Sequence, residues 1–175
     1  MEIRIRNFLK FAVVIILILV VLSLLNWLPD MLQQDTLRRY ASIEEVRIRW
    51  NQEVIYVPSY FPQEFLWPPA NIYAQKRPFA AVFMEFTRAG SDMIGLVLSQ
   101  TSSDDRVLDS AIRMVTLQER SDYLIKGRKA LLEVGVCREG IRCSSLTWHE
   151  GKYRIHVIGM VNPFELIKIS ESMVE

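Results

Sequence analysis

The stretch of sequence that decides the fold is residues 129–158, which read KALLEVGVCREGIRCSSLTWHEGKYRIHVI. Apolar and polar residues alternate along most of this stretch, which is the pattern of β-strands that bury one face. A loop at residues 138–142 and a turn at Glu150–Gly151 would divide the stretch into three antiparallel strands. This register predicts the cross-strand pairs Cys137–Cys143, Leu132–Trp148 and Trp148–Tyr153.

The register sorts the three strands into one apolar and one polar face. Because side chains alternate with a period of two, a one-residue slip would turn every side chain to the other face, so the agreement supports a meander. The apolar face is predicted to carry Ala130, Leu132, Val134, Val136, Leu146, Trp148, Tyr153, Ile155 and Val157. The polar face is predicted to carry Lys129, Glu133, Thr147, His149, Lys152, Arg154 and His156.

Alternating segments upstream of this meander indicate a larger sheet. Residues 106–120 fit either a helix or a strand. The predicted strands cover residues 54–57, 82–86 and 94–98, and the predicted turns cover residues 88–92 and Lys126–Gly127.

Two helices are predicted from their capping residues. Near the C-terminus, Asn162 is a favourable N-cap, Pro163 suits the first helical position and Glu165 follows in the first turn. Residues 42–45, SIEE, fit a capping box at the start of another helix. With the final helix on the apolar face, the expected fold class is α+β, with a curved antiparallel β-sheet covered by a C-terminal helix.

An apolar run, FAVVIILILVVLSLLNWL, occupies residues 11–28 and contains no charged residue. A helix of this length is about 27 Å long, which matches the hydrocarbon core of a bilayer, so a transmembrane helix is predicted. The run lacks the small-residue pattern of a cleavable signal peptide. Positive charge favours the cytoplasmic side and Trp27 suits the membrane interface. The expected cytoplasmic flank consists of Arg4, Arg6 and Lys10.

The expected organisation has four parts. They are a short cytoplasmic segment (1–10), a transmembrane helix (11–28), a juxtamembrane connector (29–50) and an extracytoplasmic α+β domain (51–175). The chain carries 21 Lys and Arg against 20 Asp and Glu, and this near balance gives no reason to expect a nucleic-acid partner. The expected partners are the lipid bilayer and another envelope or membrane protein.

Three blocks of sequence carry a resemblance to a known family: residues 56–62, residues 125–130, and residues 146–153 running into residues 165–173. They resemble an extracytoplasmic domain of unknown function that follows a single membrane helix in Gram-positive-type bacterial proteins, including relatives of anti-sigma factors. The resemblance spans roughly residues 54–173 and implies no catalytic residues. Residues 1–10 are too few for a sigma-binding domain, so direct sigma-factor inhibition is not expected.

Cys137 and Cys143 are the only cysteines, and the predicted hairpin places them opposite each other. Such a pair lies within disulfide range and oxidises outside the membrane, so a structural disulfide is predicted. Their spacing matches neither a zinc knuckle nor a CxxC redox motif. His149, placed opposite Lys152, would lie about 13 Å from His156, too far to share a metal ion. No metal or other cofactor is therefore expected.

Residues 56–69, YVPSYFPQEFLWPP, place aromatic side chains among prolines. A stiff loop with exposed aromatic rings loses little entropy on binding, which makes it a candidate recognition surface. The structural alternative is that the aromatic rings fold back and close one end of the core, as large aromatic side chains usually do. The predicted partner-binding residues are Tyr60, Phe61, Phe65 and Trp67.

These observations predict a non-enzymatic, membrane-anchored extracytoplasmic module that binds or senses a component of the cell envelope. The sequence contains no Gly-x-Ser-x-Gly elbow and no phosphate-binding glycine loop. The alternative prediction is a carrier of lipid or another hydrophobic ligand, because a curved sheet crossed by a helix can enclose an apolar cavity.

Overall fold

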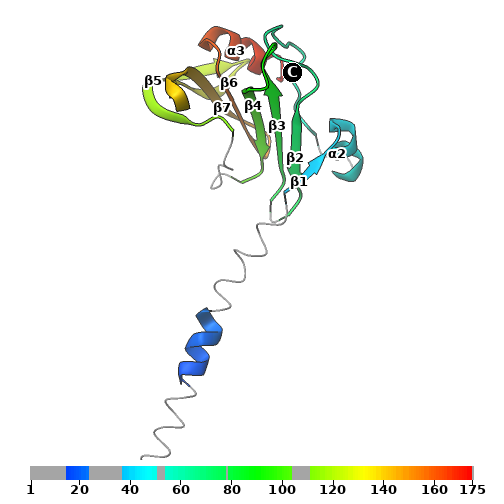
Figure 1. The fold of residues 1–175 in the computed structure, drawn as a ribbon, viewed down its shortest axis with the longest axis vertical. Helices are drawn as coiled ribbons and strands as arrows, with labels where there is room; N and C mark the ends of the chain where they lie inside the picture. The colour runs from blue at the N-terminus through cyan, green and yellow to red at the C-terminus, as the bar shows by residue number, and fades with distance from the viewer. Residues whose placement is uncertain (1–14, 24–36, 51–53, 78, 104–110, 175) are drawn as a thin grey trace, which may run out of the picture. The chain divides into compact units, whose positions relative to one another are not determined.

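An eight-stranded antiparallel sheet is the main element of the chain (Figure 1). The computed structural model describes residues 15–23, 37–50, 54–77, 79–103 and 111–174. The chain separates into two units, residues 1–36 and residues 37–175. The described residues of the first unit form a helix over 15–23, and the sheet belongs to the second unit.

The strands of the sheet vary from three to twelve residues in length. They are β1 (Arg38–Tyr40), β2 (Asn71–Gln75), β3 (Ala81–Thr87), β4 (Ile94–Thr101), β5 (Met114–Ile125), β6 (Arg128–Cys137), β7 (Arg142–Glu150) and β8 (Tyr153–Gly159). The helical elements of the same unit are α2 (Ile43–Trp50), the 3₁₀ turn η1 (Arg138–Gly140) and α3 (Pro163–Glu171). The strands predicted at residues 82–86 and 94–98 are thereby confirmed as parts of β3 and β4.

Two successive meanders make up the sheet, whose strand order is β1-β2-β3-β4-β8-β7-β6-β5. Consecutive strands are neighbours within β1–β4 and within β5–β8. Short connections join all of these pairs except β1 and β2, which are separated by residues 41–70, including α2. The two meanders join where β4 pairs with β8, from Leu96 opposite Gly159 to Thr101 opposite Arg154. This β4–β8 junction brings together segments that are distant in the sequence.

Two tight turns set the hairpins of the second meander. The turn predicted at Lys126–Gly127 is confirmed: φ is 43° at Lys126 and 86° at Gly127, the left-handed values that two-residue hairpin turns favour. Between β7 and β8, Glu150 pairs with Tyr153. The turn therefore consists of Gly151–Lys152, with φ of 57° at the glycine, and its prediction at Glu150–Gly151 is wrong by one residue.

The predicted pairing of these strands is displaced by two residues. Trp148 lies opposite Ala130 on one side and Ile155 on the other, rather than opposite Leu132 and Tyr153. A displacement of two preserves the face of every side chain because the side-chain period is two. The hydrophobic pattern therefore predicted the two faces, while the exact register depended on turn geometry that alternation alone does not specify.

The apolar face carries the core of the unit. Of its predicted members, Leu132 packs against this core, whereas the predicted residues that lie within it are Ala130, Leu146, Trp148, Tyr153, Ile155 and Val157. The first meander contributes Ile72, Ala74, Val82, Met84, Phe86, Leu96 and Leu98 to the same cluster. Both meanders therefore bury the same face of one continuous sheet.

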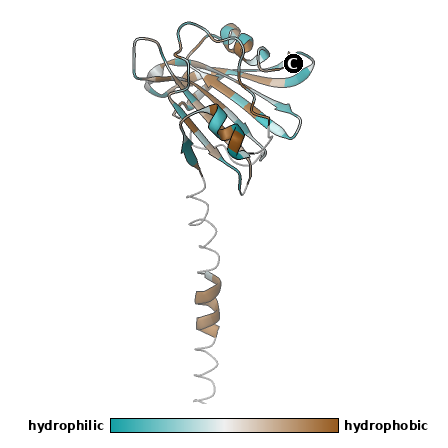
Figure 2. Ribbon diagram, turned by 90° about the vertical axis from the view of Figure 1, so that its right-hand side faces the viewer, coloured by the Kyte–Doolittle hydropathy of each residue, from teal (hydrophilic) through white to brown (hydrophobic). Residues whose placement is uncertain are grey.

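Three separate segments cover this face. Helix α2 contributes Ile43, Val46 and Trp50 to the core, and the irregular segment that follows it contributes Ile55 and Phe65. Helix α3 and the residues after it contribute Leu166, Ile169, Met173 and Val174. Figure 2 shows that α2 carries both apolar and hydrophilic residues, as a helix with one buried face does.

The fold class predicted from the sequence is wrong. The second unit is mostly an eight-stranded antiparallel sheet with short helices, rather than a sheet covered by one C-terminal helix. Helix α3 has nine residues, too few to cover eight strands, so α2 and the irregular segment share that role. The prediction missed β1, β2 and most of β5, because short or largely exposed strands show little alternation.

The predicted membrane helix is part of the same correction. Within the described ranges, the structure holds no helix that could span a bilayer. Of the predicted span 11–28, only residues 15–23 are described, and they are helical. The predicted flanking residues lie outside the described part of the chain; they are Arg4, Arg6, Lys10 and Trp27.

The capping signals found in the sequence are confirmed. The backbone N–H of Glu45 donates to the Ser42 hydroxyl at 3.1 Å at the start of α2. The backbone N–H of Glu165 donates to the Asn162 side chain at 2.9 Å at the start of α3, with Pro163 in the first turn. Both β1 and α2 fall within residues 29–50, and they belong to the second unit.

Candidate functional site

The segment between α2 and β2 begins with a hydrogen-bonded attachment to the sheet. The Gln100 side chain is fully buried; its amide donates to the Val54 carbonyl at 2.6 Å and its carbonyl accepts from the Tyr56 N–H at 3.0 Å. The strand predicted at residues 54–57 is therefore wrong. A glutamine side chain from β4 satisfies backbone groups that a neighbouring strand would otherwise pair.

The middle of the segment is fixed to the end of β3. The Leu66 N–H donates to the Thr87 carbonyl at 2.9 Å, and the Ala89 N–H donates to the Glu64 carbonyl at 2.8 Å. Phe65 forms an isolated antiparallel bridge with Arg88. The Arg88 guanidinium also lies 3.4 Å from the Glu64 carboxylate. Backbone hydrogen bonds therefore hold residues 64–66 in one position.

Aromatic rings pack together along this segment. The Phe61 ring centroid lies 4.8 Å from that of Phe86 and 6.0 Å from that of Phe65. The Trp67 ring stacks on Phe86 at 5.9 Å and meets Phe61 edge-on at 5.7 Å. Phe65 and Phe86 belong to the core and Phe61 packs against it, so this part of the segment folds back onto the core, as the structural alternative expected.

The predicted partner-binding residues differ in exposure. Phe65 is 4% exposed, and Phe61 is half-buried against the core, so neither presents a free aromatic face. Trp67 is 53% exposed and Tyr60 is 40% exposed. Leu66, which sequence reasoning missed, is 49% exposed. We call Tyr60, Leu66 and Trp67 together the Trp67 surface.

Tyr60 connects the segment to the start of α3. Its hydroxyl donates to the Glu165 carboxylate at 2.9 Å, and the Lys168 ammonium lies 2.9 Å from the same side chain. The hydrogen bond to Glu165 raises the pKa of Tyr60, and the hydrogen bonds from Lys168 and Tyr60 lower the pKa of Glu165. The Ser59 hydroxyl also donates to the Ser172 carbonyl at 3.0 Å. The segment is thus held between the sheet and α3.

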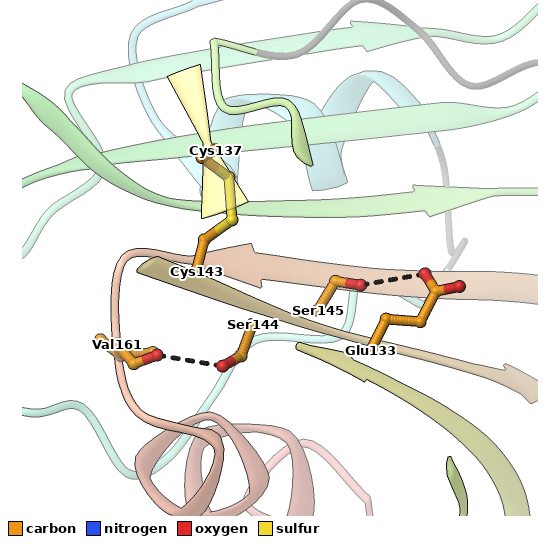
Figure 3. Close-up of a disulfide and its surroundings, with 6 residues drawn as sticks. All are labelled: Glu133, Cys137, Cys143, Ser144, Ser145 and Val161. Carbon is orange, nitrogen blue, oxygen red and sulfur yellow. Dashed lines mark hydrogen bonds between the residues drawn. A yellow bond between two sulfur atoms is a disulfide. The ribbon is translucent and has the colours of Figure 1, made fainter. Parts of the chain in front are cut away.

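The two cysteines meet on the face of the sheet opposite the apolar core (Figure 3). The Cys137 and Cys143 sulfurs are 2.09 Å apart and their Cα atoms are 5.8 Å apart, within disulfide distance. Their predicted direct pairing is wrong, because Gly135 lies opposite Cys143. Cys137 lies two residues beyond Gly135 on the same face of β6, so it meets Cys143 diagonally across the hairpin. Both cysteines are buried in a second small cluster with Val97, Ile112 and Ile158.

The two histidines lie on the polar face but not in the predicted positions. His149 is exposed and lies opposite Arg154, so its predicted pairing with Lys152 is wrong. His156 Nδ1 lies 2.8 Å from the Thr147 hydroxyl. Burial and, next, the nearby Arg154 guanidinium lower the pKa of His156 to about 4, so this ring is neutral at physiological pH.

The described residues contain no group of three or more histidine, cysteine or carboxylate side chains placed to hold a metal ion. They do include a hollow on the polar face, of about 430 Å³, which sequence reasoning missed. The sequence contained a signal for this hollow, because all of its polar residues except Asp122 were predicted to lie on the polar face. Its lining includes Asp122, Lys129, Leu131, Thr147, His149 and Arg154.

Comparison with models of protein families, with curated proteins and with solved structures yields no match to this chain. The resemblance to an extracytoplasmic domain therefore stays a prediction from the sequence. The candidate functional features of the described residues are the Trp67 surface, the cysteine pair and the hollow.

Proposed function

We propose that this chain is a non-enzymatic binding module of the cell envelope that contacts a partner protein through the Trp67 surface. The observation that supports the proposal is that two exposed apolar side chains are held in fixed positions. Leu66 and Trp67 are half exposed, yet the Leu66 N–H is hydrogen-bonded to Thr87 and the Trp67 ring stacks on Phe86.

A surface whose side chains are already held in place favours binding, because ordering flexible side chains costs free energy on association. A side chain immobilised on binding typically costs about 0.5–1.5 kcal/mol, and a ring already stacked in the free protein avoids most of that loss. Tryptophan and tyrosine are also enriched among the residues that dominate the energy of interfaces. The Trp67 surface combines these two residue types with the aliphatic Leu66 between them.

The cysteine pair supports a location outside the cytoplasm. Cys137 and Cys143 lie at disulfide distance in a buried apolar cluster. Disulfides persist in oxidising compartments and are rare in the reducing cytoplasm. A module with this pair is therefore best suited to the extracytoplasmic side of the envelope.

Site-specific photo-crosslinking of the full chain in cells tests the proposed surface. A photoreactive phenylalanine at position 66 should give a crosslinked product of defined mass, and Trp67→Ala in the same chain should abolish it. The matched control is the same probe at position 48, because Ile48 is an exposed apolar residue on α2. Equal products from positions 48 and 66, or a product insensitive to Trp67→Ala, would contradict the proposal.

A hydrophobic-ligand carrier is the second candidate, and one observation favours it. Within the described part of the chain, the Trp148 indole N–H is buried without a hydrogen-bond partner. A polar group of a ligand lodged between the sheet and its covering segments would satisfy this donor. Native mass spectrometry of the full chain would show a co-purifying lipid if the carrier reading is right, and apoprotein alone if it is wrong.

A further inference from the structure

We propose that the hollow on the polar face is a second binding site, which takes the phosphate group of an organic phosphate. The site consists of the basic residues Lys129, His149 and Arg154, together with Thr147 and Leu131. It is independent of the Trp67 surface, because Trp67 stacks on Phe86 of the apolar face, whereas these side chains lie on the polar face.

The basic residues come from three neighbouring strands. His149 of β7 lies directly opposite Arg154 of β8. Lys129 and His149 come next along β6 and β7 after the pair Ala130–Trp148. Neighbouring strands are about 4.8 Å apart, so the three side chains form a row about 10 Å long across the sheet.

The charge of the hollow comes mainly from Lys129 and Arg154, and Asp122 is the one acidic residue among those described as lining it. The low pKa of His156 reports a positive field on this part of the face, because the Arg154 guanidinium is its second cause after burial. A phosphate in the hollow would accept charge-assisted hydrogen bonds from Lys129 and Arg154.

The residue types fit an oxyanion. The planar guanidinium of Arg154 can donate two parallel hydrogen bonds to one phosphate, and the Lys129 ammonium adds a mobile positive charge. Thr147 adds a hydroxyl, which His156 holds at 2.8 Å. The site therefore supplies charge from Lys129 and Arg154, with the hydrogen-bonding side chains of Thr147 and His149 on the strand between them.

The size of the hollow indicates more than an inorganic anion. A volume of about 430 Å³ falls within the range of small-molecule sites and exceeds what one phosphate fills. Leu131 lies directly opposite Thr147, two residues along the strands from Lys129 and His149, and offers an apolar contact. The ligand is therefore expected to carry an apolar portion beside its phosphate.

Thermal unfolding of the purified full chain tests this site with two probes, inorganic phosphate and phenyl phosphate. Each should raise the melting temperature by a few degrees in a saturable way, beyond the effect of sodium chloride at equal ionic strength. Phenyl phosphate should saturate at a lower concentration than inorganic phosphate. Equal stabilisation by sodium chloride would show charge screening only and would overturn the proposal.

Matched variants make the test specific. Lys129→Gln with Arg154→Gln should abolish the saturable rise, whereas Arg138→Gln with Arg142→Gln, which removes two exposed charges at the other end of the β6–β7 hairpin, should retain it. Leu131→Ser should weaken the effect of phenyl phosphate and spare that of inorganic phosphate. A rise retained by the first double variant, or lost in the second, would overturn the site.

Discussion

The Gln100 side chain replaces a missing strand for the backbone around Tyr56: it accepts from the Tyr56 N–H at 3.0 Å and donates to the Val54 carbonyl at 2.6 Å. Gln100→Leu keeps the side-chain size but leaves both backbone groups without this partner. We expect the free energy of unfolding to fall by about 1–3 kcal/mol, and the Tyr56 amide to exchange faster with solvent.

Ser99→Ala on the adjacent residue is the control for Gln100, because the Ser99 hydroxyl donates to the His156 carbonyl rather than to this segment. Urea unfolding and hydrogen exchange measure the two effects. If Gln100→Leu left the Tyr56 amide as protected as in the natural chain, the anchoring role of Gln100 would be wrong.

The cysteine pair should contribute modestly to stability. The chain between Cys137 and Cys143 closes a short loop, for which the chain-entropy model gives about 2 kcal/mol. We expect Cys137→Ala with Cys143→Ala to lower the free energy of unfolding by about that amount without unfolding the domain. Urea unfolding with and without reductant measures it, and reductant should leave the double variant unchanged.

The same pair tests location. Protein isolated without reductant should show no free thiol after denaturation if residues 137 and 143 face an oxidising compartment. Two reactive thiols in a folded chain would leave the sheet intact and refute the extracytoplasmic location.

Gly135 is required by the close approach of β5. A Cβ atom at this position would collide with the Thr116 carbonyl oxygen, which belongs to the backbone and cannot rotate away. We expect Gly135→Ala to disturb the β5–β6 pairing and lower the melting temperature by several degrees. Gly159→Ala is the control, because the nearest atom to its Cβ would be a side-chain methyl carbon of Leu96 at 2.8 Å and not a backbone atom, and it should lower the melting temperature less.

His156 should make stability depend on pH. Its pKa is about 4 in the folded chain, against about 6.5 when unfolded, so the unfolded state binds more protons between these values. Stability from this residue is complete above pH 6.5 and declines as the pH falls towards 4, by roughly 1–3 kcal/mol. His156→Gln should therefore lose less stability between pH 7 and pH 4.5 than the natural chain.

His149→Gln is the control for this pH effect, because His149 is an exposed residue of the same face. Urea unfolding at both pH values, compared between variants, separates the histidine contribution from that of the carboxylates. An identical pH dependence in the natural chain and in His156→Gln would show that His156 does not carry it.

The sequence pattern predicted the parts of the fold that residues close together in the chain determine. The two faces of the second meander, the Lys126–Gly127 turn and the cap of α3 each depend on neighbouring residues, and the sequence shows them directly. Register is different, because it depends on where a turn begins. Moving the β7–β8 turn by one residue displaces every pair by two, which leaves each side chain on the same face and the hydrophobic pattern unchanged.

Long-range contacts explain what the sequence did not predict. The sequence around Gln100 predicts an ordinary strand residue, and it does not show that the backbone near Tyr56 bonds to this side chain. Leu66 is half exposed, and its N–H is bonded to Thr87, a contact between segments that the local pattern does not show. The hollow depends on β6, β7 and β8 being neighbours in a definite register, so Lys129, His149 and Arg154 could be predicted on one face but not in one row.

The arrangement of the sheet as two meanders also has a consequence for folding kinetics. Apart from β1, which residues 41–70 separate from β2, each meander is made of hairpins, which form by closing short loops within microseconds. The β4–β8 junction closes a much longer loop, and loop-closure entropy rises with length. Collapse into hairpins should therefore precede this junction, and its formation should set the folding rate. Destabilising changes at Leu98 or Val157, which are paired across the junction, should slow folding more than equivalent changes within either meander.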